Sequence, residues 1–281
     1  MQYSVLINER IESAMGLTNA LFLSLSPLYQ ENCGREQDVI VPLFTMLHST
    51  SSTILTLLGE EMALPDADVL LRTVMEGTVK FCYLLNGTPE ERMAKYVEYR
   101  YALYEMEMIS DHNKAVETLS IFEEFSINNS KIPFEASLLP EDFLKELQSK
   151  YTRKQRNEIK GRWTYQTMLR SLAKDKPEYR AQLGSLSTYA NTSHYAHFDW
   201  TGLSSRLAQL KSNTHNTDMH YDVAHGFRII SNILCFAMFR AWEYINVYGA
   251  KSQEIYPILS DMAKEIRELD AYANKILSEL C

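Results

Sequence analysis

The sequence predicts an all-α fold, a single bundle of about eight or nine helices. Hydrophobic residues make up 46% and charged residues 23% of the 281 positions, which is ordinary for a globular protein. The chain has only 10 Gly and 8 Pro, too few for a many-turned β-sandwich or a Gly-rich nucleotide-binding fold. Apolar residues recur with helical spacing, and no alternating run bounded by turn residues predicts a strand.

The first half of the chain predicts four helices, over residues 3–30, 37–58, 65–86 and 89–125. Pro65 near the start of the third helix and Gly87 after its end are typical of helix boundaries. The fourth opens with Thr88-Pro89-Glu90-Glu91, a capping box with proline at the first helical position. If it continues to Phe125, it is the longest helix in the chain.

Residues 127–140 (INNSKIPFEASLLP) form the one clear break, with two prolines and a polar cluster. A connection of this length is unusual in a compact bundle. It could divide the chain into subdomains 1–126 and 141–281. Because each half would hold only a few helices, we favour one helical domain over residues 1–281.

The second half predicts five further helices, over residues 141–159, 162–173, 177–197, 217–248 and 255–280. Residues 227–247 are apolar on nearly every side, as expected of a central buried helix. The last helix is amphipathic, with apolar residues that alternate in steps of four and three: Ile255, Leu259, Met262, Ile266, Leu269, Ala273, Ile276 and Leu280. This seam predicts either packing on the chain's own core or a homodimer through residues 255–280.

Charge and targeting signals favour a cytoplasmic protein without a membrane partner. The net charge of −8 disfavours non-specific binding to anionic membranes. The four cysteines form no C-x-x-C pair, and the N-terminus has no basic region of a signal peptide. The most apolar stretch, Ile229–Phe239, is too short for a bilayer, which needs about 20 residues.

Basic residues are concentrated between Lys145 and Arg180. This stretch contains eleven Lys or Arg but only four Asp or Glu. The densest part is KYTRKQRNEIKGRW, residues 150–163. Lys and Arg neutralise phosphates and aromatic faces accept stacked bases, so this strip predicts nucleic-acid binding. Its candidate residues are Lys150, Arg153, Lys154, Arg156, Lys160, Arg162 and Trp163. A solvated helix face that balances an acidic body is the alternative.

Five of the seven histidines lie within residues 194–225, which raises the question of a metal site. Asp218, Asp222 and His225 share a helical face and could form a His/carboxylate site in a bundle. However, the sequence has no E-x-x-H motif, no H-E-x-x-H and no phosphate-binding G-x4-G-K-[ST] loop. We therefore expect no metal and no cofactor, and a metal-dependent bundle enzyme is the third hypothesis for function.

Two spaced motifs point to a polar site. Asp68, Arg72, Glu76 and Lys80 recur every four residues on the helix over 65–86, a spacing that by itself is typical of a solvated stripe. Much later, Tyr189, Ser193 and His197 form Y-x3-S-x3-H, which places all three on one helical face. Leu70 and Tyr83 extend the first motif, and Trp163 lies between the two.

Together these motifs resemble an uncharacterised bacterial family of helical proteins over roughly residues 65–200. That family is similar to the higher-eukaryote-and-prokaryote-nucleotide-binding (HEPN) bundles, many of which are RNases of toxin–antitoxin and antiphage systems. The resemblance implies a HEPN-like core and a protein that acts on or senses RNA or a nucleotide, in antiphage defence or stress response. The HEPN R-x4–6-H segment is absent, since no Arg has a His five to seven residues later.

On this resemblance the site residues would be Arg72, Glu76, Tyr189, Ser193 and His197. Arg72 would hold a phosphate, His197 would act as general base or acid, and Glu76 would orient one of them. An enzyme of this kind would be a metal-independent RNase or nucleotide-processing enzyme. The alternatives are a buried polar network that only fixes helix register, and a non-catalytic interaction module that uses the C-terminal seam.

Overall fold

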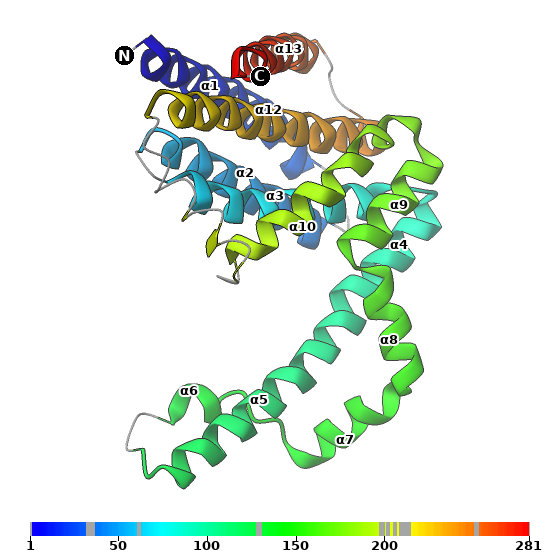
Figure 1. Ribbon diagram of the computed structural model, residues 1–281. Helices are drawn as coiled ribbons and strands as arrows, with labels where there is room; N and C mark the ends of the chain where they lie inside the picture. Colours follow the sequence, from blue (N-terminus) through cyan, green and yellow to red (C-terminus); the bar gives the residue numbers. More distant parts are fainter. Residues whose placement is uncertain are drawn as a thin grey trace. The chain divides into compact units, whose positions relative to one another are not determined.

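The computed structural model of the chain describes residues 2–31, 37–60, 63–127, 131–196, 200, 203–204, 207, 215–249 and 253–280 (Figure 1). The side chains of residues 2–5, 27–31, 191–196, 215–219 and 279–280 lie outside this description. The described residues form helices and no strand, and the chain ends in a long helix. The predicted all-α fold is therefore confirmed.

The chain divides into two compact units. Unit 1 combines Met1–Asn86 with Leu169–Cys281, and unit 2 is Gly87–Met168. The loop expected at residues 127–140 lies inside unit 2. It contains a short helix, Ile132–Glu135. A single helical domain over residues 1–281 stays a prediction.

Unit 1 is built around two long helices that pack on each other, α3 (Leu64–Leu85) and α12 (His215–Tyr248). Its other helical segments are α1 (Gln2–Glu31), α2 (Gln37–Leu57), the end of α9 (Tyr165–Asp175), η2 (Pro177–Tyr179), η3 (Ala181–Gly184), α10 (Ser185–Ala196) and α13 (Ile255–Leu280). As expected for a central helix, α12 is buried at positions that include Phe227, Ile233 and Tyr244. Helices α1 and α13 pack on α12, whereas α2 and α10 pack on α3.

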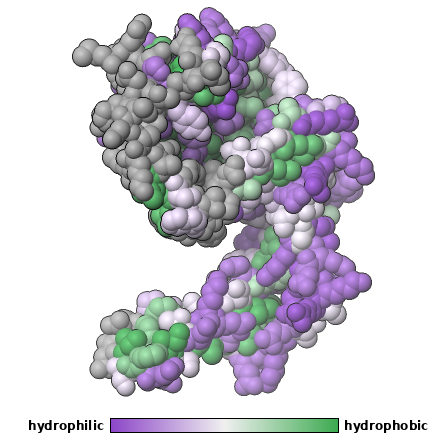
Figure 2. Space-filling view, viewed as in Figure 1, coloured by the Kyte–Doolittle hydropathy of each residue, from purple (hydrophilic) through white to green (hydrophobic). Residues whose placement is uncertain are grey.

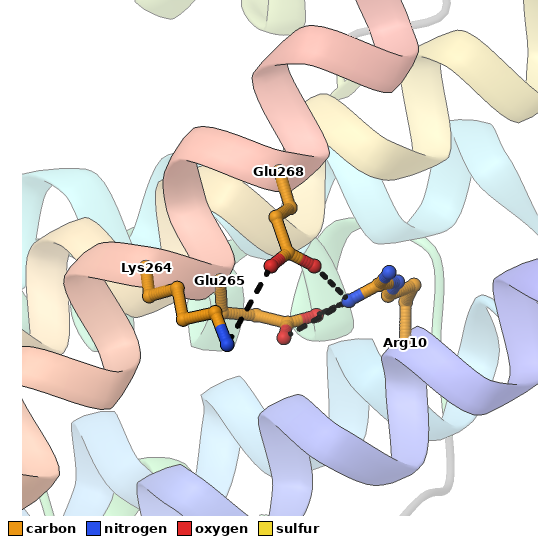
Figure 3. A network of polar contacts seen from close by, with 4 residues as sticks. All are labelled: Arg10, Lys264, Glu265 and Glu268. Atoms are coloured by element: carbon orange, nitrogen blue, oxygen red, sulfur yellow. Dashed lines mark hydrogen bonds and ion pairs between the residues drawn. The ribbon is translucent and has the colours of Figure 1, made fainter.

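The apolar seam of α13 faces the core of its own unit. Met262 and Leu269 are completely buried, and α13 packs against both α1 and α12. At the edge of this contact, Nη1 of Arg10 on α1 lies 3.1 Å from Oε1 of Glu265 and 2.9 Å from Oε2 of Glu268 (Figure 3). A homodimer through residues 255–280 stays a prediction, and it would have to use side chains of α13 outside the buried seam.

Unit 2 consists of two successive helical runs. The first run joins α4 (Pro89–Val97), the π-helical segment η1 (Glu98–Leu103) and α5 (Tyr104–Glu124). The second run holds α6 (Ile132–Glu135), α7 (Glu141–Lys150) and α8 (Arg153–Arg162). The predicted capping box before α4 is confirmed, because Thr88 and Glu91 exchange both hydrogen bonds.

The single helix expected over residues 141–159 is wrong. Helix α7 ends at Lys150, and α8 starts at Arg153 with its own capping box. The Thr152 hydroxyl accepts a hydrogen bond from the Gln155 backbone, while the Gln155 side chain accepts one from the Thr152 backbone. This reciprocal cap stabilises a new helix start, which favours a break over a continuous helix.

Two glycines are required by the local geometry. At Gly77, an added Cβ would lie 2.5 Å from Cδ2 of Leu47, so the absence of a side chain lets α2 and α3 approach closely. At Gly87, φ is +96°, a left-handed conformation that L residues with side chains rarely adopt. Gly87 thus supplies the left-handed residue directly before the capping box of α4.

By length and composition, two helical stretches could cross a membrane, Gln37–Leu57 and His220–Tyr248. A buried core helix passes the same test, and 61% of the second window is buried inside the protein. Two such helices are weak evidence for a membrane location. The cytoplasmic location expected from the sequence stays a prediction.

Candidate functional site

The charged residues that recur every four positions on α3 lie against neighbouring helices. Asp68 meets α12, whereas Arg72 and Glu76 meet α10. These three residues therefore do not form a purely solvated face, which is the interpretation that their spacing alone favours. Lys80 is the fourth member, and its Nζ lies 3.8 Å from Oε1 of Glu76 on the same helix.

Tyr189 of α10 connects Arg72 and Glu76 across more than a hundred residues of sequence. Nη2 of Arg72 donates a hydrogen bond of 3.2 Å to the Tyr189 hydroxyl, and this hydroxyl donates one of 2.9 Å to Oε2 of Glu76. The guanidinium carbon of Arg72 also lies 4.4 Å from the centroid of the Tyr189 ring, a cation–π distance. The structure thus brings together three of the five residues predicted for the site.

The Tyr189 phenol is held in its protonated form. Burial raises the pKa of Tyr189 above its ordinary value of 10, and the Glu76 carboxylate adds to this effect, against the opposing charge of Arg72. At neutral pH the phenol therefore remains a hydrogen-bond donor. Its contacts suit a role in positioning Arg72 and Glu76.

The other two predicted site residues cannot be placed. The backbone of Ser193 lies in α10, one helical turn after Tyr189, but its side chain is outside the described part of the structure. His197 lies outside the described residues altogether. Their roles stay predictions.

A histidine that the sequence did not assign to this site lies beside it. Nε2 of His225 on α12 is 2.8 Å from Oδ2 of Asp68, one helical turn before Arg72 on α3. Asp68 is buried, whereas the His225 side chain is about one-third exposed, at 33%. The only signal in the sequence was the shared four-residue spacing of Asp68 and Arg72, because the partner on α12 is 157 residues away.

Burial alone would lower the pKa of His225, but its surroundings reverse the sign. The hydrogen bond and charge of Asp68, together with the charge of Asp222, raise the pKa of His225 above its ordinary value of 6.5, with Arg228 opposing them. The imidazolium form is therefore favoured. Together with His225 of α12, the α3 stripe offers a guanidinium, an imidazole and two carboxylates.

The metal site considered at Asp218, Asp222 and His225 has no support in the described residues. These contain no group of three or more His, Cys, Asp or Glu that could hold an ion. His225 instead hydrogen-bonds to Asp68, and the side chain of Asp218 is outside the description. His225 of α12 thus contacts the polar stripe of α3 through Asp68.

A second polar cluster lies in the interior of unit 1 and was not predicted. The carboxylate of Glu243 on α12 is buried, with Nζ of Lys176 at 2.5 and 2.7 Å and the Tyr179 hydroxyl at 2.8 Å. Nearby, Nη1 of Arg240 donates a 2.6 Å hydrogen bond to the Thr78 hydroxyl of α3. These contacts join η2, α3 and α12, and the Glu243 carboxylate at their centre is fully buried.

The basic strip lies in unit 2, and part of it is engaged by that unit's own carboxylates. Lys150 pairs with Glu105 of α5, and Arg162 pairs with Glu98 of η1. Trp163 is only 7% exposed, its Nε1 donates to Glu98 at 2.6 Å, and its ring lies 5.0 Å from that of Tyr99. Lys150 therefore attaches the end of α7 to α5, whereas Arg162 and Trp163 attach the end of α8 to η1.

The remaining basic residues of the strip face solvent. Arg153, Lys154 and Lys160 are exposed, and Arg156 is half-buried. Arg153 and Lys154 border a shallow, open depression together with Asn157 and Glu158. Figure 2 shows a hydrophilic surface over the part of unit 2 that holds α7 and α8. Nucleic-acid binding by this strip stays a prediction.

Comparison with known proteins places the chain in a family. Residues 37–215 match the model of a family described as a family of unknown function, DUF5677. The match contains Arg72, Glu76 and Tyr189, and it ends before His225. No curated protein and no solved structure matches the chain. Since the match covers well over half of its length, the chain belongs to the DUF5677 family.

Proposed function

We propose that the chain is a HEPN-like helical protein that binds a phosphate group of RNA or of a nucleotide at Arg72. The observation that carries this proposal is the way Tyr189 holds Arg72, with one hydrogen bond and a ring face. A guanidinium fixed in this manner is pre-organised for two-point recognition of an anion. Its place in antiphage defence or stress response rests on the resemblance of the motifs alone.

The charge distribution on α8 supports the same class of ligand. The chain is acidic overall, yet Arg153, Lys154 and Lys160 present exposed positive charge on one short helix. Positive charge of this kind attracts a polyanion and releases its counterions on binding. We therefore assign to α8 a general attraction for the RNA backbone, and to Arg72 the contact with one phosphate.

The first experiment measures binding of a twelve-nucleotide single-stranded RNA by fluorescence anisotropy at increasing salt. We expect the affinity of the wild type to fall steeply between 50 and 200 mM salt, as it does for proteins that contact several phosphates. The triple variant Arg153→Glu/Lys154→Glu/Arg156→Glu should lose most of this binding. Absent or salt-insensitive binding by the wild type would overturn the proposal.

The second experiment separates Arg72 from the basic strip. Arg72→Gln should weaken RNA binding by roughly tenfold, the usual cost of one charge-assisted contact. Thr73→Gln is the matched control, because Thr73 is the exposed neighbour on the same helix and has no place in the site. Circular dichroism and a thermal melt establish that both variants are folded.

The third experiment asks whether binding is accompanied by cleavage. The wild type and Arg72→Gln are expressed in a bacterial host, and the purified proteins are incubated with the same RNA in the presence of EDTA. Slower growth and RNA cleavage that need Arg72 would establish a metal-independent RNase. Binding without cleavage would establish a sensor.

A further inference from the structure

We propose that His225 and Arg72 together form a phosphate-binding site, here called the seat. Asp68 is the positioning residue that holds His225 in place. This inference rests on the proposed function, because the ligand is the phosphodiester group of the RNA assigned above. It adds a recognition residue outside the matched family region. It also predicts that RNA binding depends on pH.

The geometry links the two cations through α3. Asp68 and Arg72 are four residues apart on this helix, which corresponds to a rise of about 6 Å. Nε2 of His225 lies 2.8 Å from Oδ2 of Asp68, and Arg72 follows Asp68 by one helical turn. In the proposed seat, a phosphate accepts hydrogen bonds from both His225 and Arg72.

Both side chains keep donors for a ligand. Among the described residues, Tyr189 is the one hydrogen-bond partner of Arg72, and it takes one of the five N–H donors of the guanidinium. Asp68 is likewise the one partner of His225 in the described part of the chain, and it engages Nε2. In the imidazolium form, Nδ1 carries a proton that can be donated to a phosphate oxygen.

The exposure of the residues fits a binding role. Asp68 is buried, at 6% exposure. Its carboxylate therefore serves to orient the imidazole and to favour its protonated form. His225 and Arg72 are both partly exposed and can be reached by a ligand.

The charges around the seat determine how its affinity varies with pH. The groups that act on His225 are Asp68 from α3, and Asp222 and Arg228 from its own helix. On α3, Arg72 and Glu76 follow Asp68 on the same face. Protonation of His225 adds one positive charge to this group of side chains, and deprotonation removes it. Binding of an anion should therefore weaken as the pH rises.

The test measures RNA binding between pH 5.5 and 8.5 at constant low salt. The probe is a cyanine-labelled twelve-nucleotide single-stranded RNA, whose phosphodiesters keep a constant charge over this range. We expect the wild type to bind roughly threefold to tenfold more weakly at pH 8.5 than at pH 5.5. His225→Gln should bind with a nearly constant affinity, close to the wild-type value at high pH.

Two further variants sharpen this test. Asp68→Asn keeps the shape of the side chain but removes its charge, so the decline in affinity should shift to lower pH while acid restores binding. His220→Gln on the same helix is the matched control and should retain the wild-type profile. Circular dichroism and thermal melts show which variants are folded.

A measurement on the wild type keeps the inference testable if a variant fails to fold. The His225 ring is followed by NMR through a pH titration with and without the RNA. By linkage, RNA that binds the imidazolium must raise the pKa of His225, and an unchanged pKa would overturn the seat. RNA binding that survives with its pH dependence intact in His225→Gln also overturns the seat but leaves the proposed function in place. No RNA binding at any pH overturns the proposed function itself.

Discussion

The Tyr189 hydroxyl donates a 2.9 Å hydrogen bond to Glu76, which lies 113 residues earlier in the chain. Tyr189 is on α10 and Glu76 on α3, so this bond ties two helices of unit 1 together. The same hydroxyl accepts from Arg72, which makes Tyr189 the group that positions both charged side chains. The first prediction concerns this hydroxyl.

Tyr189→Phe should destabilise the protein by about 1 kcal/mol, because it removes the hydroxyl but keeps the ring against Arg72. Tyr189→Ala should cost more, since it also removes the cation–π contact and the packing of the ring. Urea denaturation of the two variants gives the comparison. Equal losses would show that the ring contributes nothing beyond its hydroxyl, and an unchanged stability of Tyr189→Phe would show that the hydroxyl contributes nothing.

Lys176→Met should be among the most destabilising single substitutions, with a loss of about 3 kcal/mol in urea denaturation. It leaves the Glu243 carboxylate buried without its cation, which is far more costly than removing an exposed pair. The double variant Lys176→Met/Glu243→Met removes both charges and should recover a large part of that loss. If the two single losses instead add up in the double variant, the pair is not coupled.

The Asp68–His225 pair should make stability depend on pH. The pKa of His225 in the folded protein is raised above its ordinary value of 6.5. Its contribution is therefore fully present below about pH 6.5 and is lost as the pH rises through the higher folded-state pKa. The difference in unfolding free energy between wild type and His225→Gln should shrink from pH 6 to pH 8.5. A difference that grows over this range would contradict the assigned shift.

Cys82 should resist alkylation in the folded protein. Burial raises its pKa to about 12, and burial likewise raises that of Cys235 to about 11, so few thiolates are present at pH 8. With iodoacetamide and peptide mapping by mass spectrometry, we expect Cys82 to be labelled only after denaturation. Cys235 is partly exposed and should react faster, though still slowly. Labelling of native Cys82 at the rate of a free thiol would show that α3 opens readily.

Local patterns in the sequence were enough to predict the helices and part of the site. The spacing of Arg72 and Glu76, and of Tyr189 within its motif, correctly placed these residues on helical faces, and the structure brings the faces together. The capping box at Thr88 predicted the start of α4 for the same reason, because a cap is a contact within four residues. Thr152 and Gln155 carry the same three-residue signal, and α8 starts there.

Long-range pairing could not be predicted in this way. Asp68 was assigned to a solvated stripe, and His225 was considered as a metal ligand beside Asp218 and Asp222. Their contact depends on how α3 and α12 pack, which no spacing within either helix specifies. The same holds for Glu243 and Lys176, which lie 67 residues apart. Burial of a charge is decided by tertiary packing, whereas sequence spacing reports only which residues share a face.

The packing of α1 against α12 and α13 has a consequence for the synthesis of the protein. About 180 residues separate the end of α1 from the start of α12, and a ribosome that adds about 5–20 residues per second needs roughly 10–40 s to cover them. During that time the apolar face of α1, including Ala14, Leu21 and Leu25, has α2 to pack on but neither α12 nor α13. We expect the nascent chain to depend on chaperones until α13 has left the ribosome.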